Sequence, residues 1–391
     1  MSLSRRAFVK SAAGAAATGA FIAGRGHEAL AGLLARGETP VYAAEPGMVI
    51  ISSNENPMGP GKAVMDAVRA GMGATAAPNG RYPFGDENHL IETIAAKWKV
   101  KKENVLIGCG STQILRTATQ VFTSKDKALV GSIPTYEECA GYAELMGSPV
   151  KGVKLDSALA MDLDATAEAA KGSGLIFYCN PNNPTATVHT PSDTDAFIKK
   201  VHQLSPGTTF LVDEAYIDYV TTPGHKSEIE RAINDERVVV ARTFSKAYGM
   251  AGLRVGYAIG HEKTIKKMAE WEHGGSLNIL GINAAIAALN QDPNHLVNER
   301  KRNTEARDMV RGFFKKNGFK DTESQTNFIF VETRMPIQDF QKACREKGIL
   351  VARPFPPLTN WARISIGTMD EMKKAVDVFA QVLNVKAAAA A

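Results

Sequence analysis

A chain of 391 residues is long enough for one large domain and a smaller second one. Its composition, 44% hydrophobic and 22% charged, is typical of a globular protein, and its net charge of +5 without a basic block gives no sign of nucleic-acid binding. The four cysteines are widely spaced and the eight histidines contain no H-E-x-x-H pattern, so the sequence predicts no zinc or dithiol redox motif.

The first 44 residues resemble a twin-arginine export signal. Arg5 and Arg6 precede a weakly apolar run, which glycines interrupt and which is therefore unfavourable for a permanent membrane helix. Small residues at 41–44 offer cleavage sites, and the alternative is a basic, Ala-rich, disordered N-terminus. We expect export to the periplasm or the medium, and an unstructured alanine tail at 387–391.

The mature chain begins with short strands and helices in alternation. Apolar runs predict the strands, and apolar residues at every third or fourth position predict the helices. The elements expected up to residue 108 are a strand at 48–52, helices at 61–72 and 88–99, and a strand at 105–108. The loops between these elements hold Met58 and Tyr82.

The turn after residue 108 is a candidate anion site. Gly110 and Ser111 lead into a predicted helix, which we expect Ser111 or Thr112 to cap. The first turn of a helix has free N–H groups and a favourable dipole for an anion. Many helices begin in this way, so the turn alone does not identify a ligand.

The alternation continues to residue 260 and indicates a mainly parallel sheet covered by helices on both faces. The expected strands lie at 128–130, 149–155, 174–179, 208–212, 237–241 and 255–260, and the expected helices at 137–146 and 192–204. Ligands of such sheets bind at the carboxyl ends of the strands. The candidate residues that follow strand ends are Gly110, Tyr136, Asn183, Asp213 and Lys246.

A smaller α+β unit is expected after residue 260. Its predicted helices lie at 262–273, 280–290, 294–317 and 336–347, and its strands at 328–331, 349–352 and 362–366. We expect a large domain at 71–290 and a small domain made of 45–70 and 291–386.

Lys246 lies in a loop between two predicted strands. A loop that is held by strands on both sides can position a reactive amine. Thr243 and Ser245 offer hydroxyl groups and Arg254 offers a cation, a combination that suits a phosphate. An amine beside a phosphate suits a Schiff base with an aldehyde cofactor, pyridoxal phosphate. The alternative is an ordinary exposed lysine in a loop of small residues.

Other candidates also have a functional and an ordinary interpretation. Asp213 could keep a pyridine nitrogen protonated, or it could cap a helix. Tyr216 and Asn183 could hold the phenolic oxygen of the cofactor, or they could serve packing and turn formation. Tyr136 could stack on the cofactor ring or fill the core.

Two arginines are candidates for binding substrate anions. Arg363 lies inside an apolar strand. Burying its charge there costs free energy unless a bound anion or an internal salt bridge neutralises it. A carboxylate matches the fork of its guanidinium. Arg353, near a strand end, is a candidate for a second anion.

Taken together, these features resemble the aspartate aminotransferase superfamily, pyridoxal-phosphate enzymes of fold type I, and within it the histidinol-phosphate aminotransferase branch. The resemblance extends from about residue 48 to residue 385. Its motifs are Asn54-Glu55-Asn56-Pro57, Arg81-Tyr82-Pro83, Asn180-Pro181-Asn182-Asn183-Pro184-Thr185, Asp213-Glu214-Ala215-Tyr216, Ser245-Lys246-Ala247, Gly252-Leu253-Arg254 and Arg363-Ile364-Ser365-Ile366-Gly367. The resemblance implies an α/β large domain with a mainly parallel seven-stranded sheet and a smaller α+β domain.

The resemblance also implies a role for each candidate. Lys246 joins the cofactor and moves the α-proton, Asp213 pairs with the pyridine nitrogen, and Arg363 takes the substrate carboxylate. Asn183 and Tyr216 hold the phenolic oxygen and Tyr136 stacks on the ring. The phosphate is held by Gly110, Ser111, Thr243, Ser245 and Arg254, joined by Tyr82 of a neighbouring subunit. A homodimer with shared sites follows from the last of these roles.

The expected activity is transfer of an amino group between an L-amino acid, aromatic or otherwise bulky, or histidinol phosphate, and a 2-oxo acid such as 2-oxoglutarate. Met58 stands where the branch usually has an aromatic residue that lines the substrate pocket, and export fits poorly with histidine biosynthesis. The donor therefore stays open. The alternatives are another pyridoxal-phosphate reaction, such as decarboxylation or C–S cleavage, and a non-catalytic protein that binds the cofactor.

Overall fold

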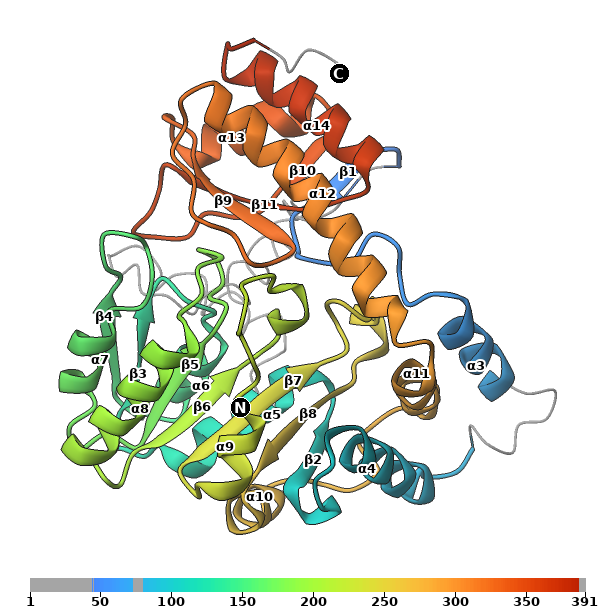
Figure 1. The fold of residues 1–391 in the computed structure, drawn as a ribbon, viewed down its shortest axis with the longest axis vertical. Helices are drawn as coiled ribbons and strands as arrows, with labels where there is room; N and C mark the ends of the chain where they lie inside the picture. The colour runs from blue at the N-terminus through green and yellow to red at the C-terminus, as the bar shows by residue number, and fades with distance from the viewer. Residues whose placement is uncertain (1–43, 45, 73–79, 387–391) are drawn as a thin grey trace, which may run out of the picture.

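The computed structural model describes residues 44, 46–72 and 80–386. The expected export signal, except for Ala44, and the C-terminal alanines lie outside these residues. Figure 1 shows a large α/β unit and a smaller α+β unit, with the long helix α12 (Asn294–Lys316) reaching from one to the other. Among the described residues, no helix has the length and hydropathy that crossing a membrane requires.

The large unit is built on a seven-stranded sheet with the order β2-β8-β7-β6-β5-β3-β4. In this sheet β8 runs in the opposite direction to the other six strands, so the expectation of a mainly parallel seven-stranded sheet is confirmed. The strands are β2 (Val105–Gly108), β3 (Leu129–Ile133), β4 (Val150–Lys154), β5 (Leu175–Cys179), β6 (Thr209–Asp213), β7 (Val238–Thr243) and β8 (Gly256–Gly260).

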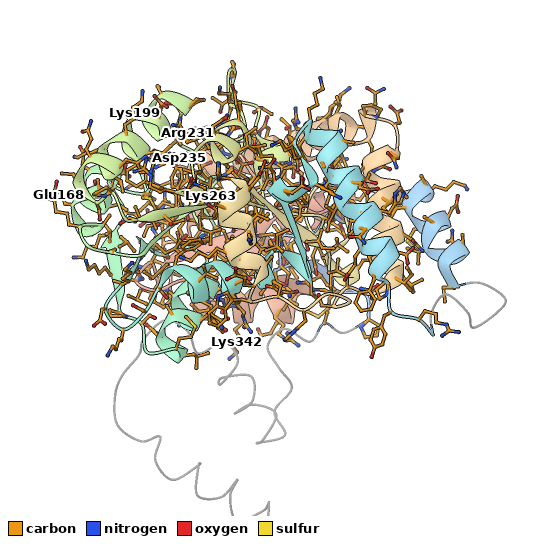
Figure 2. The ribbon with its side chains drawn as sticks, turned by 90° about the horizontal axis from the view of Figure 1, so that it is seen from below. Glu168, Lys199, Arg231, Asp235, Lys263 and Lys342 are labelled. Carbon is orange, nitrogen blue, oxygen red and sulfur yellow. The ribbon has the colours of Figure 1, made fainter. Side chains whose placement is uncertain are left out.

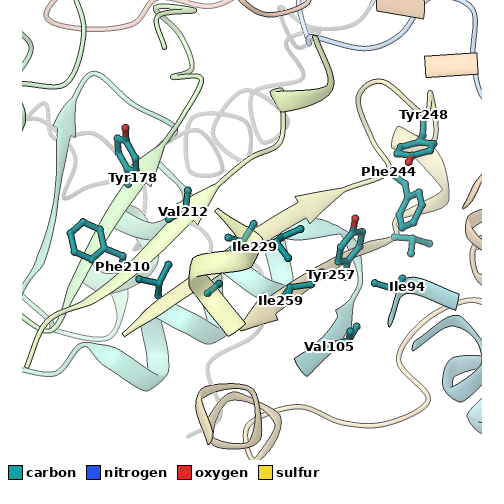
Figure 3. Close-up of a cluster of buried hydrophobic side chains, with 14 of the residues drawn as sticks. Ile94, Val105, Tyr178, Phe210, Val212, Ile229, Phe244, Tyr248, Tyr257 and Ile259 are labelled. Carbon is teal, nitrogen blue, oxygen red and sulfur yellow. The ribbon is translucent and has the colours of Figure 1, made fainter. Parts of the chain in front are cut away.

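Alternate residues of the central strands face two different hydrophobic clusters, as the pleat of a strand requires. Leu211 of β6 packs with α5 (Gly110–Phe122), α6 (Glu138–Leu145) and α10 (Glu262–Ala269) on one face. Phe210 and Val212 pack into the cluster on the other face, which Figure 3 shows together with Tyr257 and Ile259. Because both faces are covered, these strands are apolar almost throughout.

The helices that cover the second face come from distant parts of the chain. They are α3 (Lys62–Met72), α4 (Phe84–Trp98), α7 (Leu163–Ala169), α8 (Pro191–Leu204), α9 (Ile229–Asn234) and α11 (Ile279–Asn290). Val64 and Val68 of α3 are buried in this cluster together with α11. Burial of such apolar faces contributes about 25 cal/mol for each Å² removed from water.

The smaller unit contains two short sheets. Strand β1 (Val49–Ile51) pairs in parallel with β10 (Ile349–Val351), and β9 (Phe328–Glu332) pairs antiparallel with β11 (Trp361–Ser365). Helices α12, α13 (Ile337–Glu346) and α14 (Met369–Val382) cover them around a separate hydrophobic cluster. Strand β1 is thus in the smaller unit, and the division into domains at residues 70 and 290 is a proposal.

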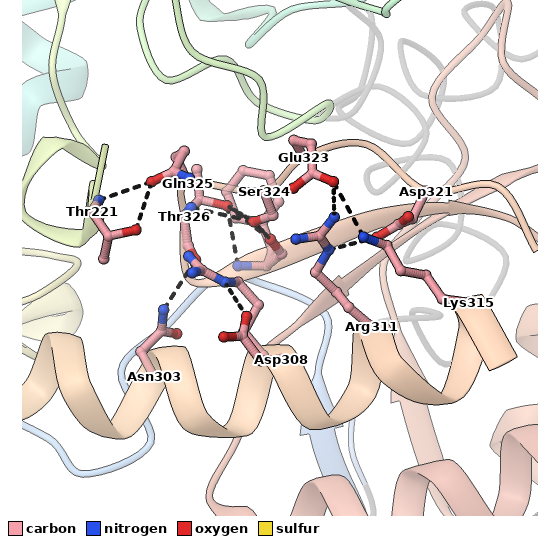
Figure 4. Close-up of polar contacts among 12 residues, drawn as sticks. Thr221, Asn303, Asp308, Arg311, Lys315, Asp321, Glu323, Ser324, Gln325 and Thr326 are labelled. Atoms are coloured by element: carbon pink, nitrogen blue, oxygen red, sulfur yellow. Dashed lines mark hydrogen bonds and ion pairs between the residues drawn. The ribbon is translucent and has the colours of Figure 1, made fainter. Parts of the chain in front are cut away.

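Polar contacts hold α12 to the loop that precedes β9. Arg311 binds Asp321 with an Nε–Oδ2 distance of 2.5 Å and Glu323 with an Nη2–Oε1 distance of 2.8 Å (Figure 4). In the same loop, Gln325 accepts a hydrogen bond of 2.8 Å from the Thr221 amide, which belongs to the larger unit. This loop therefore ties the two units together close to the ends of the parallel strands.

Charged side chains lie around the outside of the larger unit (Figure 2). Several pair over short distances at the surface, for example Lys263 with Glu236 at 2.6 Å and Lys199 with Asp195 at 2.7 Å. Each such exposed pair contributes little to stability because water screens it.

The structure differs from the sequence expectations at several helix ends. Helix α4 begins at Phe84, four residues earlier than expected, and α7, α9 and α14 were not predicted. Helices α7 and α9 are too short to show a full apolar period, whereas α14 has a capping box, Thr368 with Glu371, that the sequence shows. The expected cap at Ser111 or Thr112 is wrong: α5 begins at Gly110, and Cys109 at the cap position makes no side-chain hydrogen bond.

Candidate active site

The candidate residues gather at the carboxyl ends of β5, β6 and β7. Asp213 is the last residue of β6, Thr243 is the last residue of β7, and Lys246 follows three residues later. These strands are parallel neighbours, with Cys179 of β5 in register with Asp213. Their carboxyl ends therefore meet at one edge of the sheet, where ligands of such sheets bind.

Lys246 is held by a compact loop. Phe244 and Tyr248 are buried on either side of it, and Gly249 has a φ of 68° in a place where a Cβ atom would lie 2.2 Å from the Gly59 carbonyl oxygen. The Lys246 amine lies 3.5 Å from the Ser53 carbonyl oxygen. Because the loop cannot move aside without losing this packing, the backbone of Lys246 has a fixed position.

The surroundings of Lys246 favour its neutral form. Burial, and next the positive charge of Arg363, lower the pKa of the amine to about 8. The amine also lies 5.7 Å from the centroid of the Tyr216 ring. A neutral amine is the nucleophilic form, so this lysine is suited to covalent reaction with a carbonyl group.

Asp213 is a buried carboxyl group, 3% exposed. Burial raises its pKa to about 7, although the Ala215 N–H donates to Oδ1 at 3.1 Å and Lys246 is a nearby cation. Within the described residues, Asp213 has no partner within ion-pair distance. A carboxyl group in this state is suited to binding a protonated ring nitrogen.

Arg363 is buried, and its hydrogen bonds go only to neutral oxygens. Its Nη1 donates to Asn183 Oδ1 at 2.7 Å and its Nη2 donates to the Ser52 carbonyl oxygen at 2.7 Å. Its Nε has no hydrogen-bond partner, and burial lowers its pKa to about 10. Among the described residues no acidic side chain pairs with it, so an internal salt bridge does not explain this arginine. A ligand anion would satisfy the remaining donor.

Hydroxyl groups, a helix start and a second arginine form an anion site beside Lys246. Arg254 Nη1 lies 3.4 Å from Ser245 Oγ, and the Ser245 N–H donates to Thr243 Oγ1 at 3.1 Å. A Cβ atom on Gly110 would lie 2.4 Å from Arg254 Nη2, so only glycine lets this guanidinium reach the start of α5. A Cβ atom on Gly256 would likewise lie 2.3 Å from the Ser111 amide nitrogen.

Tyr216 is fixed between the two units. Its hydroxyl accepts a hydrogen bond of 3.2 Å from Asn54 Nδ2, and its ring contacts Phe328 edge-on with 5.0 Å between centroids. Burial raises the pKa of the Tyr216 hydroxyl well above its usual value, so the group stays protonated and can donate.

The structure does not bring all of the remaining candidates into this cluster. Tyr136 is partly buried, and burial raises its pKa to about 12. Tyr82 is 79% exposed and stacks on Phe84, and Met58 is 61% exposed. No recorded contact of the described residues joins Tyr82 or Met58 to Lys246. Arg353 already has an acidic partner, because its Nη2 pairs with Glu137.

Sequence reasoning missed Asn54 as a site residue. Its side-chain oxygen accepts a 2.7 Å hydrogen bond from Ser365 Oγ, while its amide group donates to Tyr216. Its φ of 54° lies in the left-handed region that asparagine tolerates. The signal was the Asn-Glu-Asn-Pro motif, in which polar residues directly follow a strand and precede a proline.

A cavity of about 350 Å³ adjoins the cluster without containing its reactive groups. Its lining includes Ser53, Asn56, Gly252, Ser365 and Glu371. We place the site at Lys246 because the perturbed amine and carboxyl groups and the two arginines without acidic partners meet there. In the described part of the chain, no group of three or more His, Cys, Asp or Glu side chains is suited to hold a metal ion.

The fold and the arrangement of Lys246, Asp213 and Arg363 define an enzyme of the fold type I aminotransferase class. A family model, Aminotransferase class I and II, matches residues 46–379. The chain therefore belongs to the class I and II aminotransferase family and is a transaminase.

Named relatives point to one branch of the family. The histidinol-phosphate aminotransferase of Symbiobacterium thermophilum is 33% identical over 340 residues, which cover 86% of this chain and 91% of that protein. The enzyme of the same name from Moorella thermoacetica is 31% identical and covers 86% of each chain. The solved histidinol-phosphate aminotransferase of Sinorhizobium meliloti, in complex with pyridoxal-5′-phosphate, superposes with a TM-score of 0.79 at 24% identity, over 94% of this chain and 96% of that one.

Proposed function

We propose that this protein is a pyridoxal-phosphate-dependent aminotransferase that moves the amino group of an aromatic or otherwise bulky L-amino acid to a 2-oxo acid such as 2-oxoglutarate. The observation that carries this proposal is Arg363, a buried guanidinium with an unpaired Nε and no acidic partner among the described residues. A substrate carboxylate supplies the anion that it lacks.

The residues of the cluster fit the cofactor. The site has a buried carboxyl group for the ring nitrogen, an amine of lowered pKa for the aldehyde, and a Ser–Arg–helix cradle for the phosphate. When bound, pyridoxal phosphate supplies an aldehyde for the amino group and a ring that accepts electrons from the substrate α-carbon.

Each side chain of the site then has a defined task. Lys246 presents an amine of lowered pKa that would hold the aldehyde, and its Nζ would take a proton from the substrate α-carbon and return one. The buried carboxyl group of Asp213 would hold the ring nitrogen and keep it protonated. Arg363 orients the substrate by its carboxylate, and the hydroxyl of Tyr216 donates a hydrogen bond.

The proposal is tested with a panel of donors. Purified protein is incubated with 2-oxoglutarate and L-phenylalanine, L-tryptophan, L-tyrosine or histidinol phosphate, and glutamate is measured. We expect glutamate with the aromatic amino acids. Release of carbon dioxide or ammonia without glutamate would show a different reaction on the same fold.

The variant Arg363→Ala distinguishes an effect on substrate binding from an effect on the chemical step. Its removal deletes a desolvated, bidentate ion pair, so KM for the amino acid should rise by about 100-fold with a smaller change in kcat. Arg69→Ala, which removes a surface arginine paired with Asp66 at 3.1 Å, is the control. An unchanged KM in Arg363→Ala would place the carboxylate elsewhere.

We also propose that the enzyme is exported by the twin-arginine route and works as a homodimer. The paired arginines and the apolar run that follows them support export, and this route carries folded proteins, which suits an enzyme loaded with its cofactor. Fractionation of cells that express the full chain tests it: activity in the cytoplasm alone would rule export out.

A further inference from the structure

Asn54 lies in the segment between β1 and α3 and joins the two units of the molecule. It is buried, and its backbone is held by the smaller unit on both sides. Asn327 Nδ2 donates to the Asn54 carbonyl oxygen at 3.0 Å, and the Asn54 N–H donates to Ser365 Oγ at 2.8 Å. Its side chain instead reaches Tyr216 of the larger unit, with 3.2 Å between Nδ2 and the hydroxyl oxygen.

The same contacts fix the direction of the Asn54 amide group. Ser365 Oγ already accepts the Asn54 N–H, so its own proton is available to Asn54 Oδ1, which lies 2.7 Å away. With Oδ1 held by Ser365, the amide nitrogen faces Tyr216 and can only donate. The Tyr216 oxygen is therefore the acceptor in its hydrogen bond with Asn54.

The hydroxyl proton of Tyr216 is consequently left for another acceptor. The ring is buried and packs against Phe328, so it holds the oxygen in place. Among the described residues, no hydrogen bond is recorded in which Tyr216 is the donor. The titratable groups that act on this hydroxyl are Arg363, Asp213 and Cys179. A proton held at this place, with the Lys246 amine 5.7 Å from the ring centroid, suits a negatively charged oxygen of a ligand.

We infer that Asn54 is a positioning residue: by donating to the Tyr216 oxygen, it turns the Tyr216 proton away from itself and towards the phenolic oxygen of the cofactor. The inference rests on the proposed function in one respect, the placing of pyridoxal phosphate on Lys246. It deepens that function because a side chain held by the smaller unit then controls a hydrogen bond to a cofactor bound by the larger one.

The absorbance of the bound cofactor reports this hydrogen bond. The nitrogen that joins the cofactor to Lys246 shares a proton with the phenolic oxygen. When that proton is lost, the oxygen bears the full negative charge and the absorbance changes. A hydrogen bond from Tyr216 favours the charged oxygen and lowers the pKa of this change. Loss of the hydrogen bond should therefore raise the pKa, whether or not the enzyme turns over.

The test is a pH titration of holoenzyme absorbance in a double-mutant cycle of Asn54→Gly and Tyr216→Phe. Glycine accepts the φ of 54° found at Asn54, so Asn54→Gly removes the amide group without straining the backbone. We expect Tyr216→Phe to raise the pKa by about one unit and Asn54→Gly to raise it by about half a unit. In the Tyr216→Phe background, Asn54→Gly should add less than about 0.2 unit, because no hydroxyl proton remains to be oriented.

Two further variants separate orientation of the proton from a general loosening of the segment. Asn327→Ala removes the hydrogen bonds to the Asn54 and Glu55 carbonyl oxygens but keeps the Asn54 side chain, so it should shift the pKa by less than about 0.2 unit. Ser365→Ala frees the Asn54 amide group to turn, so it should raise the pKa in the native background but not in Asn54→Gly.

Thermal unfolding shows whether each variant is folded. If Asn54→Gly does not fold, Ser365→Ala takes its place in the cycle with Tyr216→Phe, where it should raise the pKa only when the Tyr216 hydroxyl is present.

Several results would overturn the inference. They are an equal rise for Asn54→Gly with and without the Tyr216 hydroxyl, no rise with it, an equal rise in Asn327→Ala, and the same pKa in the native chain and Tyr216→Phe. If the coupling is found but no amino donor yields glutamate, the inference stands and the proposed aminotransfer fails. Glutamate formation without the coupling would support the aminotransfer and exclude this role of Asn54.

Discussion

At the scale of single residues, burial has moved two pKa values at the centre of the site towards each other. The pKa of the Asp213 carboxyl group is raised to about 7 and that of the Lys246 amine is lowered to about 8. When the cofactor is absent, this environment disfavours the charged form of both groups, so neither charge stabilises the folded protein. The site is therefore strained electrostatically in a way that a cationic ring nitrogen and an aldehyde relieve.

Lys246→Ala should abolish transamination and leave the fold intact. The variant loses the amine that reacts and the base that moves the proton, and a partly buried lysine whose pKa is lowered contributes little to stability. Glutamate formation and a thermal unfolding curve measure the two effects, and Lys263→Ala at the surface is the control. In the native enzyme, borohydride reduction followed by peptide mapping should place the cofactor on Lys246. A label on another residue, or substantial activity in Lys246→Ala, would refute the assignment.

Asp213→Asn should remove a pH dependence of stability in the cofactor-free protein. Because the folded pKa of Asp213 is raised above its unfolded value, its contribution is present at low pH and is lost as the pH rises through about 7. Relative to Asn, Asp should therefore destabilise the protein by about 2–3 kcal/mol more at about pH 8 than at about pH 5.

Urea unfolding of both cofactor-free proteins at the two pH values measures this difference. Asp218→Asn is an unsuitable control because Asp218 pairs with Arg242, so Asp193→Asn in α8 serves. A stability difference between the native chain and Asp213→Asn that does not depend on pH would contradict the raised pKa.

At the scale of elements, a buried ion pair joins β7 to the residue that directly follows β6. Arg242 Nη1 lies 3.2 Å from Glu214 Oε2, and both side chains are almost fully buried. Arg242 Nη2 also binds Asp218 at 2.9 Å, and its guanidinium lies over Trp98. These contacts fix the end of β6, which carries Asp213, and the end of β7, which Lys246 follows by three residues.

Arg242→Met should destabilise the protein by about 3–5 kcal/mol, because it leaves the Glu214 carboxylate buried without its counterion. The loss should be smaller at low pH, where Glu214, whose pKa burial already raises, can bind a proton. Urea unfolding measures both effects. The matched control is Arg237→Met, which removes an arginine paired with Asp235 near the surface and should cost under about 1 kcal/mol. An equal decrease in the free energy of unfolding in the two variants would mean that the buried ion pair stabilises the protein no more than the surface pair does.

At the scale of the whole molecule, several large apolar side chains remain exposed at the surface. Tyr82 is 79% exposed, Met58 is 61% exposed and Phe84 is 54% exposed. Exposed apolar groups of this kind suit an interface between subunits, in agreement with the proposed homodimer.

If the proposed homodimer shares its sites, the enzyme should sediment as a dimer, and Tyr82→Ala should release pyridoxal phosphate about tenfold faster, because it would remove the proposed hydrogen bond to the phosphate from the neighbouring subunit. Sedimentation velocity and the decay of cofactor absorbance during dialysis measure the two quantities. Leu145→Ala, at a site that is 83% exposed, is the control. A monomer, or unchanged cofactor release, would exclude the shared site.

Most strands and long helices could be predicted, and so could the cluster at the strand ends, because apolar period and turn residues are local properties of the chain. Helices α7 and α9 could not, since six or seven residues do not show a period. Gly110 at the start of α5 packs closely against Arg254, a contact distant in sequence that no local pattern reveals.

The sequence alone determined the class of this protein, since Lys246, Asp213 and Arg363 each lie in a motif whose neighbours identify its chemistry. Only the tertiary structure decided which charged side chains have a counterion within the protein. Arg363 meets Asn183 and Ser52 from 180 and 311 residues away, and Arg353 meets Glu137 from 216 residues away. Such partners depend on the order of strands in the sheet and on how the two units pack. A local pattern can therefore show that a charge is present, but it cannot show whether that charge is free to bind a ligand.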